Sequence, residues 1–173
     1  MQLNQAKQIA EKYCELLHPY CHRVEIAGSI RRKKPEVKDI EIVCIPKRMP
    51  LNGGLFGYSP DELVTDPGFD EIINSLEKIK GEPGGKYTQR KLTEGINLDL
   101  FICFKRNWGN IFAIRTGSAE YSHKVLATGW VKKGFKGIDG FLYKGKTRID
   151  LFEEEDLFRL LGIPWIEPEK REI

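Results

Sequence analysis

Apolar residues recur at helical spacing near the start of the chain and again before its middle. The first set is Leu3, Ala6, Ile9, Ala10, Tyr13, Leu16 and Leu17. The second set is Phe69, Ile72, Ile73, Leu76 and Ile79. This spacing predicts an amphipathic helix over residues 3–17 and a second helix over residues 69–79, with Asp66 and Pro67 near its start.

Alternating or continuously apolar segments predict strands between these helices. Residues 23–29 indicate a strand that enters a glycine turn, and residues 37–45 alternate before becoming apolar, as a strand does when it enters a core. Residues 81–104 indicate a turn, a strand, a glycine break and a second strand. Residues 46–68 are rich in glycine and proline, so we expect a loop there.

The pattern changes after Cys103. Residues 116–135 predict a helix that is entered through a Thr-Gly-Ser turn, and a hairpin is expected around Lys144 and Gly145. A short helix with an acidic start follows, and Gly162 and Pro164 end it. We therefore expect an α/β lobe over residues 1–104 and a smaller basic lobe over residues 105–173.

Composition indicates a compact globular protein of 173 residues, 40% of them hydrophobic. The N-terminus has no apolar signal-peptide region, and no apolar run approaches the roughly 18 residues of a spanning helix, so we expect no membrane partner. The cysteines lack zinc or redox spacing: Cys14, Cys21, Cys44 and Cys103. Free thiols in a reducing cytoplasm are the expectation, with a disulfide left open.

Charge is unevenly distributed, although the net charge is only +3. Residues 104–148 contain ten Lys or Arg against two acids, a local charge of +8, whereas residues 149–173 carry −5. Such a segment is typical of a lobe that faces a polyanion, with an ordinary solvated surface as the equal alternative.

Three acids stand in apolar strand sequences. Asp39 and Glu41 point to the same face of one strand because side chains alternate with period two, and Asp99 lies alone in another strand. If the strands are neighbours, the three carboxylates repel one another unless a cation such as Mg²⁺ neutralises them. Two such ions can assist a phosphoryl displacement. Taken alone, the Asp39/Glu41 pair more simply indicates the solvated face of an edge strand.

Residues suited to phosphate binding precede these acids. Gly28 and Ser29 follow a strand and precede a run of cations, Arg31, Arg32, Lys33 and Lys34. A glycine at a strand end lets backbone N–H groups approach a phosphate, and an Arg side chain adds bidentate donors. A Gly-Ser pair alone is usually a turn, but this pair, Arg32 and the two acids within fourteen residues are a rarer combination.

These motifs resemble the nucleotidyltransferase superfamily of DNA polymerase beta, and most closely its X-family DNA polymerases. The matching features are Gly28-Ser29, the spaced Asp39 and Glu41, the later Asp99 and the Thr116-Gly117-Ser118 turn. The C-terminal sequence from Glu153 to Arg171 also matches, so the resemblance covers nearly the whole chain. It implies an α+β fold: a nucleotidyltransferase palm with a mixed, largely antiparallel sheet flanked by helices, followed by a small thumb-like α+β lobe.

The resemblance also implies a function, that of a minimal palm-plus-thumb DNA polymerase that adds dNTPs to primer-template or gapped DNA. Asp39, Glu41 and Asp99 would be catalytic and would ligate two Mg²⁺ ions, with Mn²⁺ as the alternative. The nucleotide would contact Gly28, Ser29, Arg32, Thr116, Gly117, Ser118 and Ser122. DNA contacts are expected from Lys86, Lys124, Lys132 and Lys133. We expect a monomer in the cytoplasm, without the lyase and helical DNA-binding domains of larger relatives.

Some positions depart from the family pattern. Glu41 stands where relatives commonly have Asp, and Asn97 stands where a basic residue often braces the carboxylates. Ile114 and Arg115 replace an aromatic pair that crowds the sugar 2′ position, which predicts weaker discrimination against ribonucleotides. Two alternatives remain: a template-independent or small-acceptor nucleotidyltransferase, and a non-catalytic nucleic-acid-binding protein of the same fold.

Overall fold

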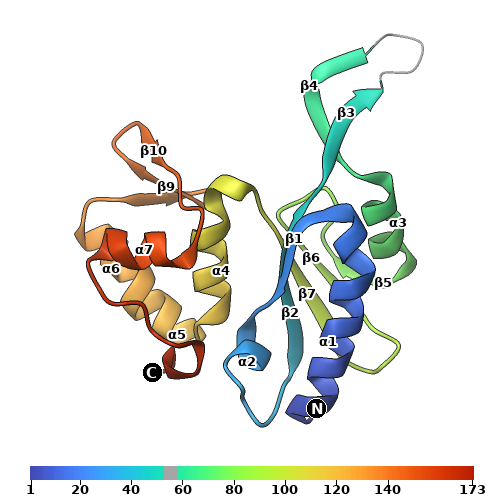
Figure 1. Ribbon diagram of the computed structural model, residues 1–173, viewed down its shortest axis with the longest axis horizontal. Helices are drawn as coiled ribbons and strands as arrows, with labels where there is room; N and C mark the ends of the chain where they lie inside the picture. Colours follow the sequence, from blue (N-terminus) through green and yellow to red (C-terminus); the bar gives the residue numbers. More distant parts are fainter. Residues whose placement is uncertain (53–57) are drawn as a thin grey trace.

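The computed structural model describes residues 1–52 and 58–173 and has two lobes (Figure 1). The N-terminal lobe contains α1 Leu3–Leu17, β1 Cys21–Ile26, α2 Gly28–Arg31, β2 Asp39–Pro46, β3 Arg48–Asn52, β4 Tyr58–Thr65, α3 Pro67–Ser75, β5 Glu77–Lys80, β6 Tyr87–Lys91 and β7 Asn97–Ile102. The C-terminal lobe contains α4 Trp108–Thr116, α5 Ala119–Tyr121, a π-helical segment Ser122–Ala127, α6 Thr128–Lys132, β8 Lys136–Ile138, β9 Phe141–Lys144, β10 Thr147–Ile149 and α7 Glu154–Leu161.

A five-stranded sheet organises the N-terminal lobe, in the order β1-β2-β7-β6-β5. Strands β2 and β7 run parallel, and the other neighbours are antiparallel. The predicted mixed, largely antiparallel sheet is therefore confirmed. Because β2 lies between β1 and β7, the alternative that Asp39 and Glu41 belong to an edge strand is wrong.

The two faces of this sheet have different partners. On one face, Ile40, Ile42, Leu98 and Leu100 pack in a core with the apolar side of α1 and with α3. On the other face, Val43, Ile45 and Phe101 pack with Trp108 and Phe112 of α4. Since side chains alternate along a strand, Asp39, Glu41 and Asp99 belong to the second face, which the C-terminal lobe approaches.

The C-terminal lobe is built from helices and the small sheet β10-β9-β8. Helical structure runs from Ala119 to Lys132, and the side chain of Ser118 caps its start by accepting from the Tyr121 backbone N–H at 3.1 Å. Leu126, Leu142, Leu157 and Phe158 are buried together in its core. Gly162 ends α7 in the left-handed conformation, as its sequence predicts.

The expected loop over residues 46–68 is wrong where the structure describes it, since β3 and β4 pair as an antiparallel hairpin. Residues 53–57 lie outside the described residues. Pro50 pairs with Leu63 in this hairpin. A ribbon of two strands has an unpaired side on each strand, so it tolerates a proline that would disfavour a central strand.

The second helix was predicted too long. It begins at Pro67, where the Asp66 side chain accepts from the Gly68 backbone N–H at 2.8 Å, but it ends at Ser75. Leu76 is extended, and Ile79 lies in the edge strand β5, where its side chain is exposed. Apolar residues of an edge strand had continued the helical spacing by coincidence. No helix in the described ranges is both long and apolar enough to cross a membrane.

Candidate functional site

The parallel pairing of β2 with β7 brings the three acids together on one face. Glu41 lies opposite Asp99, and Asp39 lies opposite Asn97. All three acids line a cavity of about 350 Å³, together with Ser29 and Arg32. The strands that carry these residues are thus neighbours, as the sequence interpretation required.

Gly28 allows the start of α2 to lie close to the Glu41 side chain in the wall of this cavity. Its φ is +58°, and a Cβ built on it would lie 1.7 Å from Glu41 Oε2. The Ala27 backbone N–H also donates to the Glu41 carbonyl oxygen at 2.8 Å. A side chain at this position would be strained at this φ and would have to displace the Glu41 carboxylate, so Gly28 lets the start of α2 lie close to Glu41.

Negative charge in the cavity is incompletely neutralised by the chain. Burial raises the pKa of Glu41 to about 7, and the charge of Asp99 adds to this rise against the attraction of Arg32. Burial and Asp99 also raise the pKa of Asp39. A cation bound between these carboxylates would favour their ionised forms and oppose both pKa shifts.

Hard divalent cations fit this donor set by its chemistry, because carboxylate oxygens are their preferred ligands. In the part of the chain that the structure describes, however, no three His, Cys, Asp or Glu residues converge closely enough to form a metal-ligating group. The backbone places Asp39, Glu41 and Asp99 on one face, but their side chains do not converge to form a metal-ligating group.

Two residues that the sequence interpretation missed hold Asp99. The Tyr87 hydroxyl donates to Asp99 Oδ1 at 2.6 Å, and Gln89 Nε2 donates to the same oxygen at 2.8 Å. Strand β6 pairs with β7 so that Gln89 lies opposite Asp99. The period-two alternation of Tyr87 and Gln89 is the signal that could have found them, once β6 and β7 were taken as neighbours.

Arg32 reaches the cavity but is already engaged. Its Nε donates to Glu172 Oε1 at 2.6 Å, and its Nη1 donates to the Thr116 carbonyl oxygen at 2.7 Å. Lys34 also pairs with Glu172, at 3.3 Å. The C-terminal segment therefore brings the Glu172 carboxylate into contact with Arg32, which was expected to hold phosphates, and with the neighbouring Lys34.

The Thr-Gly-Ser turn lies at the junction of the lobes. Gly117 and Ser122 line a cavity of about 470 Å³, and Glu41 and Arg32 form part of its wall as well. The Ser122 hydroxyl donates to the Ile114 carbonyl oxygen at 2.7 Å, and the Ser118 backbone N–H donates to the Arg171 carbonyl oxygen at 2.9 Å. The turn is thus adjacent to the acids, although Ser118 and Ser122 are engaged in internal hydrogen bonds.

The four lysines predicted to contact DNA are all exposed, but they do not form one cluster. Lys132 and Lys133 lie at the end of α6, and Lys124 pairs with Glu120 on the preceding helical turn. Lys86 is in the N-terminal lobe and pairs across the junction with Asp139. Their role in DNA binding stays a prediction.

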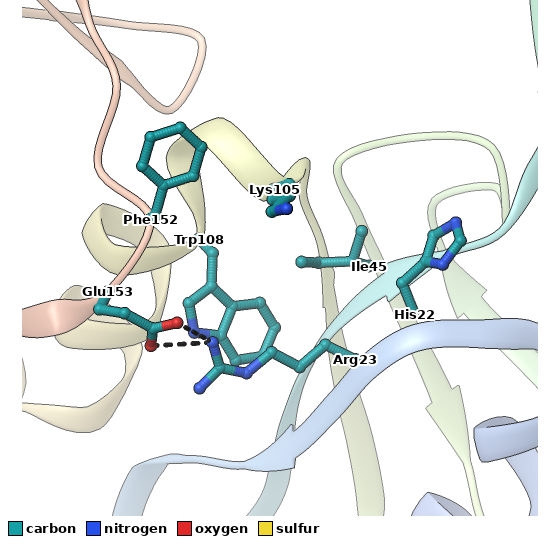
Figure 2. Close-up of a pocket in the computed structure, with 7 residues that line it drawn as sticks. All are labelled: His22, Arg23, Ile45, Lys105, Trp108, Phe152 and Glu153. Carbon is teal, nitrogen blue, oxygen red and sulfur yellow. Dashed lines mark hydrogen bonds and ion pairs between the residues drawn. The ribbon is translucent and has the colours of Figure 1, made fainter.

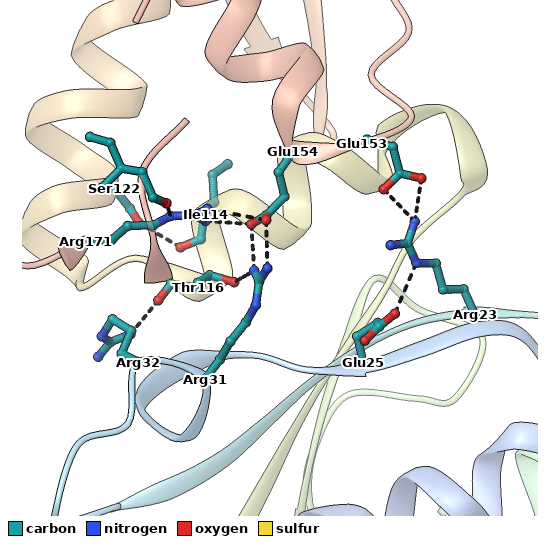
Figure 3. Close-up of polar contacts among 11 residues, drawn as sticks. Arg23, Glu25, Arg31, Arg32, Ile114, Thr116, Ser122, Glu153, Glu154 and Arg171 are labelled. Carbon is teal, nitrogen blue, oxygen red and sulfur yellow. Dashed lines mark hydrogen bonds and ion pairs between the residues drawn. The ribbon is translucent and has the colours of Figure 1, made fainter. Parts of the chain in front are cut away.

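The buried Glu154 carboxylate forms two ion pairs beside this site, and the pair with Arg31 joins the lobes. Arg31 donates to both carboxylate oxygens of Glu154, at 2.7 and 2.8 Å, and Arg171 donates to Glu154 Oε1 at 2.6 Å (Figure 3). The side chain of Arg171 is fully buried. Arg31 also donates to Thr116 Oγ1 at 2.5 Å, so the same arginine fixes the turn next to the acids.

A larger cavity, of about 530 Å³, opens elsewhere between the lobes, near the other end of β2 (Figure 2). Arg23 lies over the Trp108 ring at 4.2 Å and donates to both carboxylate oxygens of Glu153 at 2.8 Å. His22, Ile45 and Phe152 complete much of the lining. Glu153 is its one carboxylate and is paired, so the acidic cavity is the better candidate for chemistry.

Part of the sequence and the whole fold are similar to those of known proteins. Residues 113–172 match the model of the DNA polymerase beta thumb family. DNA polymerase IV of Saccharomyces cerevisiae is 36% identical over 81 residues, which cover 44% of this chain. The matched stretch spans only 13% of the yeast protein.

Two solved structures of Leishmania infantum polymerase beta share the fold, each with a TM-score of 0.69. One is described as a ternary P/T complex, is 17% identical, and matches 100% of this chain and 77% of that one. The other is a ternary gap complex, is 16% identical, and matches 99% of this chain and 70% of that one. The predicted fold class and the predicted resemblance are both confirmed.

Proposed function

We propose that this chain, which is polymerase beta-like in its C-terminal sequence and in its whole fold, is a DNA polymerase that extends a primer with dNTPs. The proposed substrate is a DNA duplex with a short gap, because a solved structure of the same fold is described as a gap complex. The observation that carries the proposal is the position of Glu41 opposite Asp99 in adjoining parallel strands, beside Gly28 and Ser29.

The reaction is an in-line displacement at phosphorus. The primer 3′-hydroxyl oxygen forms a bond to the α-phosphorus of the nucleotide, the bond to the bridging oxygen breaks, and pyrophosphate leaves. Asp99 is proposed to accept the hydroxyl proton on Oδ2, because Tyr87 and Gln89 both donate to Oδ1. Two Mg²⁺ ions, or Mn²⁺, held by Asp39, Glu41 and Asp99, would supply charge neutralisation at the attacking and leaving oxygens.

Other residues of the chain bind and orient the nucleotide. Ser29 and Arg32 would hold the β and γ phosphates, with Arg32 exchanging its contact to Glu172 for a phosphate oxygen. The cavity beside Gly117 would take the sugar, since it shares a wall with the cavity of the acids. Positioning and electrostatic complementarity of this kind account for most of the catalysis in phosphoryl transfer.

Primer extension on a labelled duplex with a one-nucleotide gap tests the proposal. We expect single dNTPs to be added according to the template base with Mg²⁺, and addition to be lost in Asp39→Ala and Asp99→Ala. Extension that ignores the template would instead support template-independent transfer. DNA binding without any extension would support a non-catalytic nucleic-acid-binding protein.

A further inference from the structure

Two arginines and two phenylalanines form a row across the junction of the lobes. The Phe104 and Phe141 rings lie 6.2 Å apart between centroids, with an angle of 29° between their planes. The guanidinium of Arg48 lies 4.2 Å from the Phe104 ring, and that of Arg148 lies 5.0 Å from the Phe141 ring. We call these four residues the aromatic row.

Phe104 makes the aromatic row accessible to a ligand, whereas Phe141 is half-buried. The side chain of Phe104 is 45% exposed, although an aromatic ring is among the side chains that gain most from burial. A single exposed phenylalanine is ordinary, but here two rings and two guanidinium groups come from four different segments of the chain. Aromatic rings flanked by cations are a composition that surfaces for single-stranded nucleic acid use.

A cavity that is partly lined by aromatic rings lies beside Phe104 of the aromatic row. It has a volume of about 270 Å³, and its lining includes Phe104, Phe101, Tyr87 and Arg115. Tyr87 stacks on Phe101 at 5.1 Å, and its hydroxyl donates to Asp99. Tyr87, which contacts Asp99, therefore lines the same cavity as Phe104.

We infer that this cavity and the aromatic row bind the unpaired template nucleotides that lie beyond the primer terminus. The bases would stack on Phe104 and Phe141, and the phosphates would meet Arg48 and Arg148. The local charge of +8 in residues 104–148 attracts a polyanion. Rings without hydrogen-bonding groups stack on any base, so this binding should not depend on the template sequence. The inference rests on the proposed function, because it takes the occupant to be a template strand.

The occupant is a single strand and not a duplex, for a physical reason. Only an unpaired nucleotide exposes both faces of its base to a ring, because in a duplex its neighbours cover them. Phosphate binding alone would need only cations and would not account for the Phe104 ring, which is 45% exposed.

The test compares the dissociation constants of two duplexes, one blunt and one with an unpaired template overhang, on the full chain. We expect the overhang to lower the dissociation constant of wild type by about 5- to 100-fold for each stacked base. The double variant Phe104→Ala/Phe141→Ala should lose this gain, while its affinity for the blunt duplex stays unchanged. Phe152→Ala is the matched control, because its side chain is 43% exposed and lies outside the aromatic row. A fluorescent 2-aminopurine in the overhang should be quenched by wild type and by the control.

A second variant keeps the test independent of folding defects in the first. Arg148→Gln leaves both rings in place and should reduce the salt dependence of overhang binding by about one counterion. An overhang gain that survives in the double variant, or that is missing in wild type, overturns the inference. Primer extension measured in parallel separates the two proposals, because a failed extension with an intact, ring-dependent overhang gain contradicts only the polymerase.

Discussion

Tyr87 and Asp99 are joined by a hydrogen bond of 2.6 Å, in which the tyrosine hydroxyl donates to Oδ1 of the carboxylate. Gln89 donates to the same oxygen, and Oδ2 accepts no hydrogen bond from the residues that the structure describes. The two donors fix the rotation of the carboxylate and leave one oxygen for chemistry. Asn97, at the position from which relatives often brace the acids, is thus not the bracing residue in this chain.

Tyr87→Phe should therefore lower kcat of primer extension by about 10-fold, with little change in KM for the nucleotide, because a hydrogen bond to a charged group is lost. The ring of the variant still stacks on Phe101, so folding should be unaffected. Adding Gln89→Ala should lower kcat further. An increase in KM at constant kcat would show that Tyr87 contacts the nucleotide and does not position Asp99.

Mg²⁺ should stabilise the protein more at about pH 8 than at about pH 6, because Glu41 has a pKa of about 7 and must ionise to hold a cation. Without metal the sign is opposite: the folded pKa lies above the unfolded value near 4.3, so the contribution of Glu41 to stability is lost as pH rises through 7. Thermal melts with and without Mg²⁺ measure both effects. Glu41→Gln should remove the pH dependence of the metal effect, and a dependence that persists in this variant would assign it to another group.

Glu154→Gln should destabilise the protein by about 3–5 kcal/mol, because the buried Arg171 and the half-buried Arg31 both lose their carboxylate partner. Burial opposes ionisation of Glu154, but hydrogen bonds from Arg31 and Arg171 outweigh it and lower its pKa. Its contribution is therefore present above the unfolded pKa near 4.3 and is lost as pH falls through the folded pKa.

Glu153→Gln is the matched control for Glu154→Gln, in denaturant melts between about pH 3 and about pH 7. The Glu153 side chain is 54% exposed and pairs with Arg23, so this change should cost less than about 1 kcal/mol. Equal losses from both variants would contradict the distinction between the buried and the exposed pair.

Glu172→Gln should lower KM for the nucleotide by about 5-fold, because Arg32 is freed to bind phosphate. Glu169→Gln, which removes the partner of exposed Lys33, should leave KM unchanged. Titration of the apoprotein with pyrophosphate gives the same comparison without catalysis. Weaker pyrophosphate binding by Glu172→Gln would mean that Glu172 orients Arg32 for the phosphate and does not compete with it.

Arg115→Phe should sharpen the preference for dNTPs over ribonucleotides by about 10-fold, because an aromatic side chain would crowd the sugar 2′ position. Arg115 lines the same cavity as Gly117 and Glu41, and its guanidinium lies 4.1 Å from the Phe101 ring. Single-turnover incorporation of both nucleotides measures the ratio. An unchanged ratio would place the ribose away from Arg115.

Local patterns in the sequence were sufficient for most of the elements and for the acidic residues. The helix over residues 3–17 follows from apolar spacing, and the start of α3 follows from Asp66 and Pro67. Asp39 and Glu41 share a face because alternation is a property of any strand. Gly28 is needed because its φ is positive and a Cβ would collide with Glu41.

Long-range packing decided what the sequence left open. The register of β6 on β7 brings Gln89 opposite Asp99, and the docking of the C-terminal lobe brings Glu154 to Arg31 and Glu172 to Arg32. No local pattern marks Glu154 and Glu172 as the partners of Arg31 and Arg32, because ion pairs between distant segments depend on how whole faces pack. The hairpin of β3 and β4 was missed for the same reason: pairing with another strand, and not composition, makes a glycine- and proline-rich segment a strand.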